Sequence, residues 1–217
     1  MTAKAKRITG LLLAGGQSRR MAQAFEGKSQ GDKGLLDLAG KPMLARVIER
    51  LAPQADAMVI NANGDPARFA PFGLPVVPDT IEGFVGPLAG ILAGLRWSAA
   101  NAPGAEYVAS VSTDAPFLPI DLVVRLQQGL AAGSGKIALA SSGGELHPVI
   151  GLWPVALADD LEEALKQGLR KVLRWTDGHG TVPVEFPFIE MKGRQIDPFF
   201  NANTPEELDE ARRLMQM

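Results

Sequence analysis

The sequence predicts an α/β protein of three layers, in which helices cover both faces of a mostly parallel sheet that carries a small antiparallel addition. Short apolar runs recur along the chain, and most are continuous rather than alternating, which is typical of strands covered on both faces. These runs are residues 8–13, 57–60, 75–77, 107–111, 137–140 and 149–153. Helical patterns lie between the runs, and this alternation is typical of parallel β-α units.

The predicted helices follow recognisable start signals. Three of them begin near a proline, which is favoured in the first turn of a helix. These prolines are Pro42, Pro87 and Pro119. A fourth helical pattern covers residues 155–169. The last helix has the clearest start, because Thr204 and Glu207 form a capping box around Pro205.

Two segments fit neither pattern. Residues 22–32 are polar and contain glycine, which predicts a mobile loop. Residues 179–195 hold two short apolar stretches, around 182–186 and 188–191. These stretches predict a strand pair that forms the antiparallel addition.

Length and composition exclude several classes of protein. The 217 residues suit one domain, covering residues 1–217, with an ordinary core. A net charge of −2 gives no general attraction for nucleic acid or an anionic membrane. The chain has no cysteine and two histidines, which excludes disulfides, thiolate-bound metals and thiol nucleophiles and nearly excludes a multi-histidine metal site. No apolar run approaches the roughly 18 residues of a membrane span, and the arginines after the first glycine turn suit a signal peptide badly, which predicts a cytoplasmic protein.

The first candidate site is the turn after the first strand. Backbone N–H groups of small residues can approach a phosphate or a base there, and cations further along the chain can neutralise a polyphosphate. The turn residues are Leu13, Ala14, Gly15 and Gly16, and the cations are Arg20 and Lys33. A tight turn with surface arginines explains the glycines equally well. The segment has neither the dinucleotide fingerprint nor a complete P-loop.

Polar residues follow other predicted strands. Asp114 comes just after the run at 107–111, where a carboxylate can hold Mg²⁺ together with substrate phosphates. Asp79 follows the run at 75–77 in the same way. Each aspartate could instead cap a turn. Asn61 and Asn63 follow the second strand and allow the same two interpretations.

Two further stretches precede helices. Gly86 lies just before a helix whose N-terminus suits an anion or a base edge, or it serves close packing. Asn201 and Asn203 alternate ahead of the last helix, so their amides can face one side and bind a metal, a phosphate or a pterin edge. Taken alone, they equally well satisfy a loop backbone. His147 has no evident acidic partner, which favours a partnered polar residue over a catalyst.

These residues belong to an ordered set of motifs that spans the chain. The set comprises Leu13-Ala14-Gly15-Gly16, Arg20-Met21, Asp32-Lys33-Gly34-Leu35-Leu36, Gly40-Lys41-Pro42, Asn61-Ala62-Asn63, Gly86-Pro87-Leu88-Ala89-Gly90, Thr113-Asp114-Ala115-Pro116 and Phe200-Asn201-Ala202-Asn203-Thr204-Pro205. It resembles the nucleotidyltransferases with a GT-A-like, Rossmann-type fold. Within that superfamily it is most similar to the molybdenum cofactor guanylyltransferases, also called molybdopterin-guanine dinucleotide synthases.

The resemblance implies an activity and a set of site residues. GMP would pass from GTP to molybdenum-bound molybdopterin with release of pyrophosphate, and Mg²⁺, or Mn²⁺ in its place, would assist. The implied catalytic residues are Arg20, Lys33 and Asp114. The implied nucleotide-binding residues are Leu13, Ala14, Gly15, Gly16, Lys33, Asn61, Asp79, Gly86 and Asp114. The implied metal ligands are Asp114 and Asn201, and Asn201 and Asn203 would lie on the pterin side.

Two departures from the family pattern concern the first loop. Ala22 stands where the family usually has glycine, and the gap to Lys33 is longer than usual. The longer loop suggests a segment that closes over GTP. Lys28 competes with Lys33 for the phosphate role, and the surrounding motif favours Lys33.

Three other functions remain open at the level of sequence. A sister enzyme that makes the cytosine dinucleotide cofactor from CTP resembles Leu-Ala-Ala-Gly at the first turn, and the glycine at position 15 favours GTP. A sugar-phosphate nucleotidyltransferase would usually need a longer chain. A non-catalytic carrier of nucleotide or pterin would not need the retained cations and carboxylate. For an enzyme, the resemblance implies transient contact with a molybdenum-insertion protein and with apo-molybdoenzymes, and neither nucleic acid nor membrane as a partner.

Overall fold

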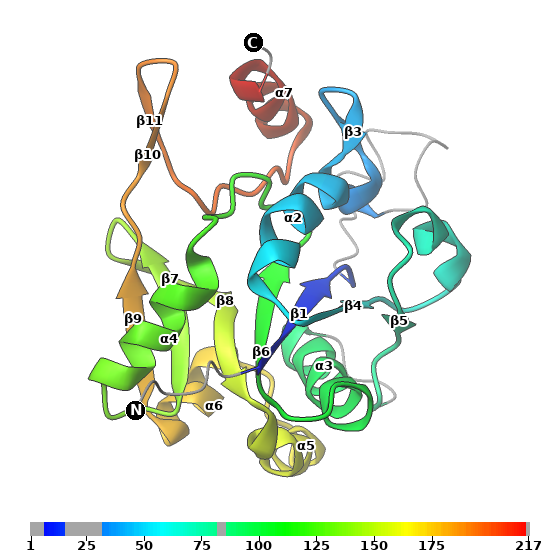
Figure 1. The fold of residues 1–217 in the computed structure, drawn as a ribbon, viewed down its shortest axis with the longest axis vertical. Helices are drawn as coiled ribbons and strands as arrows, with labels where there is room; N and C mark the ends of the chain where they lie inside the picture. The colour runs from blue at the N-terminus through cyan, green and yellow to red at the C-terminus, as the bar shows by residue number, and fades with distance from the viewer. Residues whose placement is uncertain (1–6, 16–31, 82–85, 216–217) are drawn as a thin grey trace.

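A computed structural model describes residues 7–15, 32–81 and 86–215 of the chain. Its main sheet has seven strands in the order β5-β4-β1-β6-β8-β7-β9. The strands are β1 (Arg7–Leu13), β4 (Ala57–Asn61), β5 (Val76–Val77), β6 (Ala105–Ser112), β7 (Ile137–Ser142), β8 (Glu145–Pro154) and β9 (Thr181–Glu185). Neighbouring strands are parallel except at β8, which runs antiparallel to both β6 and β7 (Figure 1).

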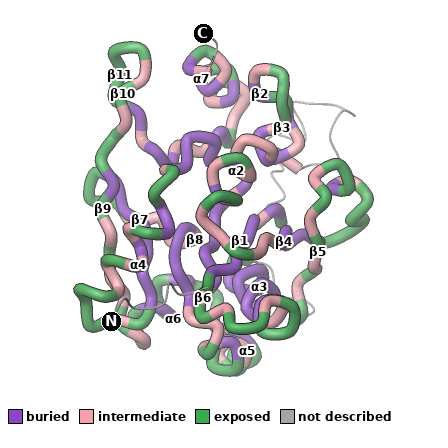
Figure 2. The backbone as a smooth tube through the Cα atoms, viewed as in Figure 1, coloured by how far each residue is buried: buried purple, intermediate pink, exposed green. Residues whose placement is uncertain are grey.

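Helices cover both faces of the sheet, so the predicted three-layer α/β arrangement is confirmed. One face packs against α2 (Met43–Leu51) and α4 (Leu122–Ala132). The other packs against α3 (Pro87–Asn101), α5 (Ala158–Lys166) and α6 (Val172–His179). The tube in Figure 2 shows buried residues concentrated in the central strands, which lie between the two helix layers, and in α3. Both faces of the strands are apolar because both are removed from water.

The antiparallel part of the sheet differs from the sequence prediction. The run at 149–153 lies in β8, which reverses direction after a two-residue turn at Gly143 and Gly144. Both glycines have positive φ, 56° and 82°, which is the geometry of a tight hairpin. A continuous apolar run indicates that both faces of a strand are covered, but it does not indicate whether the strand is parallel or antiparallel to its neighbours. The pair of glycines was the sequence signal for this reversal.

The strand pair predicted at 182–186 and 188–191 is wrong in its pairing. The first stretch forms β9, which joins the main sheet parallel to β7. The second forms β10 (Ile189–Met191), which pairs with β11 (Arg194–Ile196) in a separate antiparallel hairpin. Pro187 separates the two predicted stretches, and a proline favours a change of chain path over a tight hairpin.

The last helix, α7 (Pro205–Met215), returns to the first part of the chain. Its start is the predicted capping box: Glu207 N donates to Thr204 Oγ1 at 3.2 Å, and Thr204 N donates to Glu207 Oε2 at 2.9 Å. Its apolar face packs beside the small ribbon of β2 (Asp37–Leu38) and β3 (Lys41–Pro42). Residues 37–42 and the last helix, far apart in the sequence, therefore lie side by side (Figure 1).

Besides η1 (Lys33–Leu35), which lies beside the site, the described residues contain three further 3-10 helices. They are η2 (Ala52–Gln54), η3 (Pro66–Phe72) and η4 (Val155–Leu157). The predicted helix at 155–169 thus begins as η4 and continues as α5. Within the described residues, no helix combines the length and apolar character needed to cross a bilayer.

Candidate active site

The candidate site lies where β1, β4 and β6 end, because these strands are parallel and their carboxyl ends share one edge of the sheet. Ala14 follows β1 and donates its backbone N–H to Asn61 O at 2.9 Å. Thr113 follows β6 and donates its hydroxyl to Leu13 O at 3.4 Å. These bonds tie together the three strand ends that the sequence singled out.

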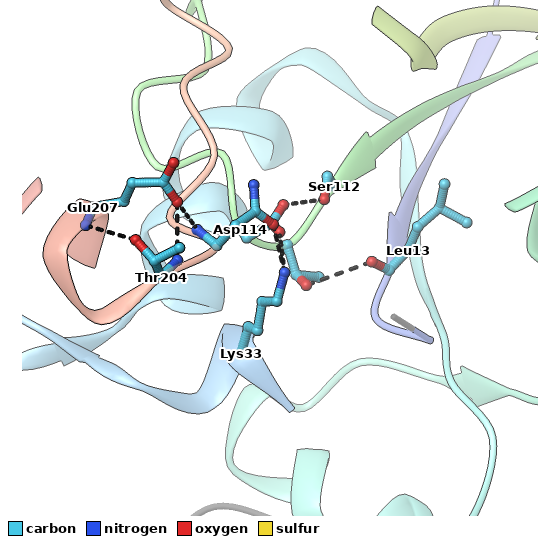
Figure 3. Close-up of polar contacts among 8 residues, drawn as sticks. Leu13, Lys33, Ser112, Asp114, Thr204 and Glu207 are labelled. Carbon is cyan, nitrogen blue, oxygen red and sulfur yellow. Dashed lines mark hydrogen bonds and ion pairs between the residues drawn. The ribbon is translucent and has the colours of Figure 1, made fainter. Parts of the chain in front are cut away.

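Lys33 and Asp114 form an ion pair at the centre of this edge (Figure 3). The Lys33 Nζ atom lies 3.5 Å from Asp114 Oδ2 and donates to Asn203 Oδ1 at 2.5 Å. Ser112, the last residue of β6, donates its hydroxyl to the other carboxylate oxygen of Asp114. The side chains of Lys33 and Asp114 are only 16% and 13% exposed, so water screens their attraction less than it would on an open surface.

The loop that carries Asn201 and Asn203 is fixed beside Asp114. Ala202 N donates to Asp114 O at 3.2 Å, so one asparagine stands on each side of this contact. Asn201 Oδ1 is buried and has no hydrogen-bond partner within the described residues. A buried amide oxygen without a partner costs free energy unless a ligand satisfies it.

This donor set fits the Mg²⁺ that the resemblance implies. Mg²⁺ prefers oxygen ligands and is usually held by one or two carboxylates together with substrate phosphates. Asp114 offers the carboxylate, and the unpartnered Asn201 Oδ1 offers an amide oxygen. Groups of three or more His, Cys, Asp or Glu side chains suited to a metal do not occur in the described ranges. A metal that binds together with the nucleotide does not require such a group.

Asp79 is held in place by two asparagines on the β4 side. Asn61 Nδ2 donates to Asp79 Oδ1 at 3.0 Å, and Asn63 Nδ2 donates to Asp79 Oδ2 at 2.8 Å. Asn63 Oδ1 accepts in return from Asp79 N at 2.9 Å. We call Asn61, Asn63 and Asp79 the amide wall. The predicted site residues Asn61 and Asp79 are therefore in direct contact, although 18 positions separate them.

Helix α3 approaches the amide wall through small residues. A Cβ atom at Gly90 would lie 2.3 Å from Asn61 Oδ1, so only glycine allows this helix to pass so close. Gly86, the N-cap, has a φ of 151° and open space where a Cβ would be, as a position that lines a pocket requires. At Gly15 an added Cβ would meet only Asn61 Oδ1, at 3.8 Å. Within the described residues, space is therefore open beside the first turn at Gly15.

Some predicted residues lie outside the described part of the chain. They are Gly16, Arg20, Lys28 and the predicted loop at 22–32 up to its last residue. That last residue, Asp32, is described, and its carboxylate accepts a hydrogen bond from Arg68 Nε. The roles of Gly16 and Arg20 stay predictions.

Sequence reasoning missed two contributors to the site. Ser112 had a signal, because residues two apart at the end of a strand point to the same side and can reach one another. Arg68 had no such signal, because its partner Asp32 is 36 positions away and Arg68 itself belongs to none of the motifs.

A second polar cluster lies on the β7 side of the same edge. Ser142 donates its hydroxyl to Asp197 Oδ1 at 2.9 Å, and His147 Nε2 lies 2.6 Å from the same hydroxyl oxygen. The His147 ring also contacts Phe199, with ring centroids 4.6 Å apart. Burial lowers the pKa of His147, against the opposing charges of Asp197, Glu145 and Glu185. His147 is thus a partnered polar residue, and the acid beside it came from a distant part of the chain.

Comparison with known proteins identifies the family. Residues 10–181 match the family described as the MobA-like NTP transferase domain. A molybdenum cofactor guanylyltransferase of Bradyrhizobium sp. (strain ORS 278) is 53% identical, over 97% of this chain and 94% of its own. One from Rhodopseudomonas palustris (strain BisB5) is 52% identical, over 94% of this chain and 92% of its own. The chain belongs to the molybdenum cofactor guanylyltransferase family. The resemblance drawn from the motifs is confirmed.

Solved structures agree with this assignment. Molybdopterin-guanine dinucleotide biosynthesis protein A from Archaeoglobus fulgidus superposes with a TM-score of 0.68 at 26% identity, covering 94% of this chain and 97% of that one. The 4-diphosphocytidyl-2C-methyl-D-erythritol synthase from Anaerococcus prevotii superposes with a TM-score of 0.70 at 12% identity, covering 98% and 97%. The second likeness concerns the fold alone, and it confirms a Rossmann-like nucleotidyltransferase fold.

Proposed function

We propose that this chain, as a single domain, transfers GMP from GTP to the terminal phosphate of molybdenum-bound molybdopterin, with Lys33 and Asp114 at the reacting end. Within a family of guanylyltransferases, the observation that carries this assignment of residues is the shielded ion pair between Lys33 and Asp114 at the end of β6. A cation and a carboxylate held together at the carboxyl edge of a parallel sheet suit a magnesium nucleotide, because the cation can bind phosphate and the carboxylate can bind the metal.

The substrates supply the reacting groups themselves. A phosphate oxygen of the pterin attacks the α-phosphorus of GTP, the bond from that phosphorus to the β-phosphate oxygen breaks, and pyrophosphate leaves. The protein then needs to position the two phosphates and neutralise charge, and it needs no nucleophile of its own. Lys33 holds phosphate oxygens in this scheme, with Arg20 as its partner, and Asn203 orients the Lys33 ammonium.

Asp114 and Asn201 would hold Mg²⁺, or Mn²⁺ in its place. When bound, the metal would supply positive charge that offsets the negative charge developing on the phosphates. Ser112 keeps the Asp114 carboxylate in one orientation, and the contact from Ala202 keeps the asparagine loop beside it. Asn201 and Asn203 would lie on the pterin side of this point.

The open space beside Gly15 is where the guanine base is proposed to lie, between the first turn and the amide wall. Asn61 and Asp79 contact the nucleoside, and Leu13, Ala14 and Gly86 line the pocket. Because a Cβ at position 15 would project into this space, Gly15→Ala tests base choice directly. It also changes the turn from Leu-Ala-Gly-Gly to the Leu-Ala-Ala-Gly of the cytidylyltransferase pattern.

Calorimetric titration with GTP, CTP and ATP, each with Mg²⁺, tests the proposal. We expect the unmodified protein to bind GTP most tightly. Lys33→Ala should weaken GTP binding, and Gly15→Ala should reduce the difference in affinity between GTP and CTP. Release of pyrophosphate only when GTP and molybdopterin are both present would support transfer. Tighter binding of CTP by the unmodified protein would contradict the assignment, and unchanged GTP affinity in Lys33→Ala would contradict the role of that lysine.

The setting of the reaction follows from its substrates. We propose that the protein acts in the cytoplasm and makes transient contact with a molybdenum-insertion protein and with apo-molybdoenzymes. Co-purification of the protein with an apo-molybdoenzyme would support this step.

A further inference from the structure

Arg68 in η3 has every edge of its guanidinium engaged. Its Nε donates to the Asp32 carboxylate, its Nη2 donates to Asn63 O at 2.6 Å, and its Nη1 donates to Asp65 O. The guanidinium carbon also lies 4.6 Å from the centre of the Phe69 ring, which is buried. Each of the three guanidinium nitrogens thus donates a hydrogen bond within the protein, and these three bonds hold the group in place.

The partners of Arg68 belong to two different parts of the candidate site. Asp32 directly precedes Lys33, and its backbone carbonyl accepts from Leu35 N at 3.1 Å at the start of η1. Asn63 is the member of the amide wall that contacts both the side chain and the backbone N–H of Asp79. One guanidinium therefore joins the base of the phosphate-binding lysine to the wall assigned to the nucleoside.

The ion pair between Arg68 and Asp32 is well shielded. Their side chains are 15% and 13% exposed, in contrast to the Lys41–Glu49 pair, whose side chains are 54% and 53% exposed. Exposed pairs contribute little, whereas removal of one partner from a shielded pair leaves an unpaired charge and is costly. The shielded pair can therefore hold a fixed geometry.

We propose that Arg68 is a positioning residue for the nucleotide: with Asp32 it fixes the separation between Lys33 and the amide wall, and so matches the site to a nucleoside triphosphate. The inference rests on the proposed function, since it takes Lys33 as the phosphate contact and Asn61 and Asp79 as nucleoside contacts. It assigns to Arg68 an effect on GTP that is exerted through Asp32 and Asn63 rather than by contact.

The expected effect is on the affinity for GTP and not on the binding of the acceptor, molybdopterin. Arg68→Ala removes a charge-assisted bond to Asp32 and a bond to Asn63 O, and bonds of that kind correspond to about tenfold or more in affinity when their loss loosens a site. We expect the Kd for magnesium GTP and the KM for GTP to rise by about this factor. The KM for molybdopterin should stay within about twofold, because every contact of Arg68 lies on the nucleotide side.

The experiment measures the GTP Kd by calorimetry, both KM values, and the thermal midpoint of Arg68→Ala, Arg68→Lys, Asp32→Asn and the double variant Asp32→Asn/Arg68→Ala. Arg46→Ala is the matched control. The Arg46 guanidinium also donates to two backbone carbonyls, Leu38 O and Ala39 O, each at 2.7 Å, but it joins β2 to α2 away from the wall. Asp32→Asn nearly preserves shape, so it reports on the pair even if Arg68→Ala folds poorly.

The proposal predicts a specific pattern. Arg68→Ala and Asp32→Asn should each weaken GTP binding, and the double variant should be no worse than the poorer single one, because both disrupt the same pair. Arg68→Lys should recover part of the affinity, since lysine keeps the charge but lacks the planar fork. Arg46→Ala should leave GTP affinity unchanged whatever it does to the thermal midpoint.

Three results would overturn the inference. GTP affinity in Arg68→Ala equal to that of Arg46→Ala would show that the arginine contributes to folding alone. Weak GTP binding in Arg68→Ala with full affinity in Asp32→Asn would mean that Arg68 contacts GTP itself. Independent, additive losses in the double variant would show that the pair does not act as a unit. Lys33→Ala separates these results from failure of the proposed function, because only the latter leaves that variant with normal GTP affinity.

Discussion

Two polar clusters lie along the same edge of the sheet, and they are built on different principles. On the β4 side, the amide wall and Arg68 form an alternating set of amides, carboxylates and a cation, and open space adjoins it at Gly15. On the β7 side, Ser142, His147 and Asp197 form a chain that closes on an aromatic ring. Among the described residues, the first cluster lies beside open space at Gly15, whereas the second packs against the Phe199 ring.

A matched pair of aspartates on this edge, one beside β6 and one in the second cluster, sharpens the contrast. Asp114 and Asp197 each accept a hydrogen bond from a serine, Ser112 in one case and Ser142 in the other. Asp114 then meets the Lys33 ammonium, whereas Asp197 accepts a second bond from Phe199 N at 2.8 Å and so shapes the loop that leads to Asn201. The same serine–aspartate contact thus lies beside the proposed metal site in one place and shapes a loop in the other.

Replacing these two aspartates is the strongest test of the contrast. We expect Asp114→Ala to lower kcat by about 10²–10³, or about 3–4 kcal/mol, as loss of one electrostatic contact in a transition state does. The variant should still fold, with some loss of stability because Lys33 loses the partner of its shielded pair. Asp197→Ala should lower the free energy of unfolding by about 1–3 kcal/mol, because two donors lose their acceptor. Turnover kinetics and urea unfolding of both variants provide the measurements.

Asp121→Ala is the control for that pair of variants. Asp121 is an exposed carboxylate that lies 3.9 Å from Arg125 Nη1, so its loss should measurably change neither kcat nor the free energy of unfolding. Near-normal turnover in Asp114→Ala would contradict the metal assignment. A fall in turnover in Asp197→Ala as large as that in Asp114→Ala would contradict the different roles given to the two aspartates.

Gly90→Ala tests whether the amide wall depends on the closeness of α3. The new Cβ would lie 2.3 Å from Asn61 Oδ1, so we expect a loss of about 1–3 kcal/mol in stability together with weaker GTP binding. Gly94→Ala is the matched control in the same helix, where the Cβ would meet the Leu11 side chain at 2.5 Å. Calorimetry with GTP should separate the two, because only Gly90 contacts the wall. Equal GTP affinity in both variants would contradict the role given to Asn61.

Thr204→Ala removes half of the capping box of α7 and tests the support that this box gives to the asparagine loop. We expect a loss of about 1 kcal/mol in the free energy of unfolding, typical of a lost helix cap. Thermal or urea unfolding measures it. Because Glu207 Oε2 also accepts from Asn203 N at 2.7 Å, a modest rise in the KM for GTP should accompany the loss. A variant as stable as the parent protein would show that the cap is not needed.

The smallest effect expected is a pH dependence on the β7 side. Burial lowers the pKa of His147 from its ordinary value of 6.5, so below about that pH the unfolded chain binds a proton that the folded protein does not. Stability contributed by neutral His147 is therefore present above pH 6.5 and is lost as the pH falls towards the pKa of the folded state. Urea unfolding across this range should show a steeper acid decline in the parent than in His147→Gln. Parallel curves would contradict the inferred burial effect.

The sequence by itself determined the parts of this protein that depend on local physics. Continuous apolar runs predicted strands covered on both faces, and prolines and a capping box predicted where four helices begin. The order of the motifs also predicted the family, and it named Lys33, Asp114, Asn61 and Asp79. The strand and helix signals depend on neighbouring residues alone, through side-chain periodicity, restricted backbone angles and hydrogen bonds within a turn. The family and its site residues came from the resemblance of the ordered motifs.

Only the tertiary structure decided which of these groups meet. Lys33 and Asn203 are 170 positions apart, Ser142 and Asp197 are 55 apart, and Asp32 and Arg68 are 36 apart. The pairing of β9 with β7 and the position of α7 beside β2 were settled in the same way. No local pattern encodes these contacts, because they form only when the burial of helix faces against the sheet brings distant segments to one edge.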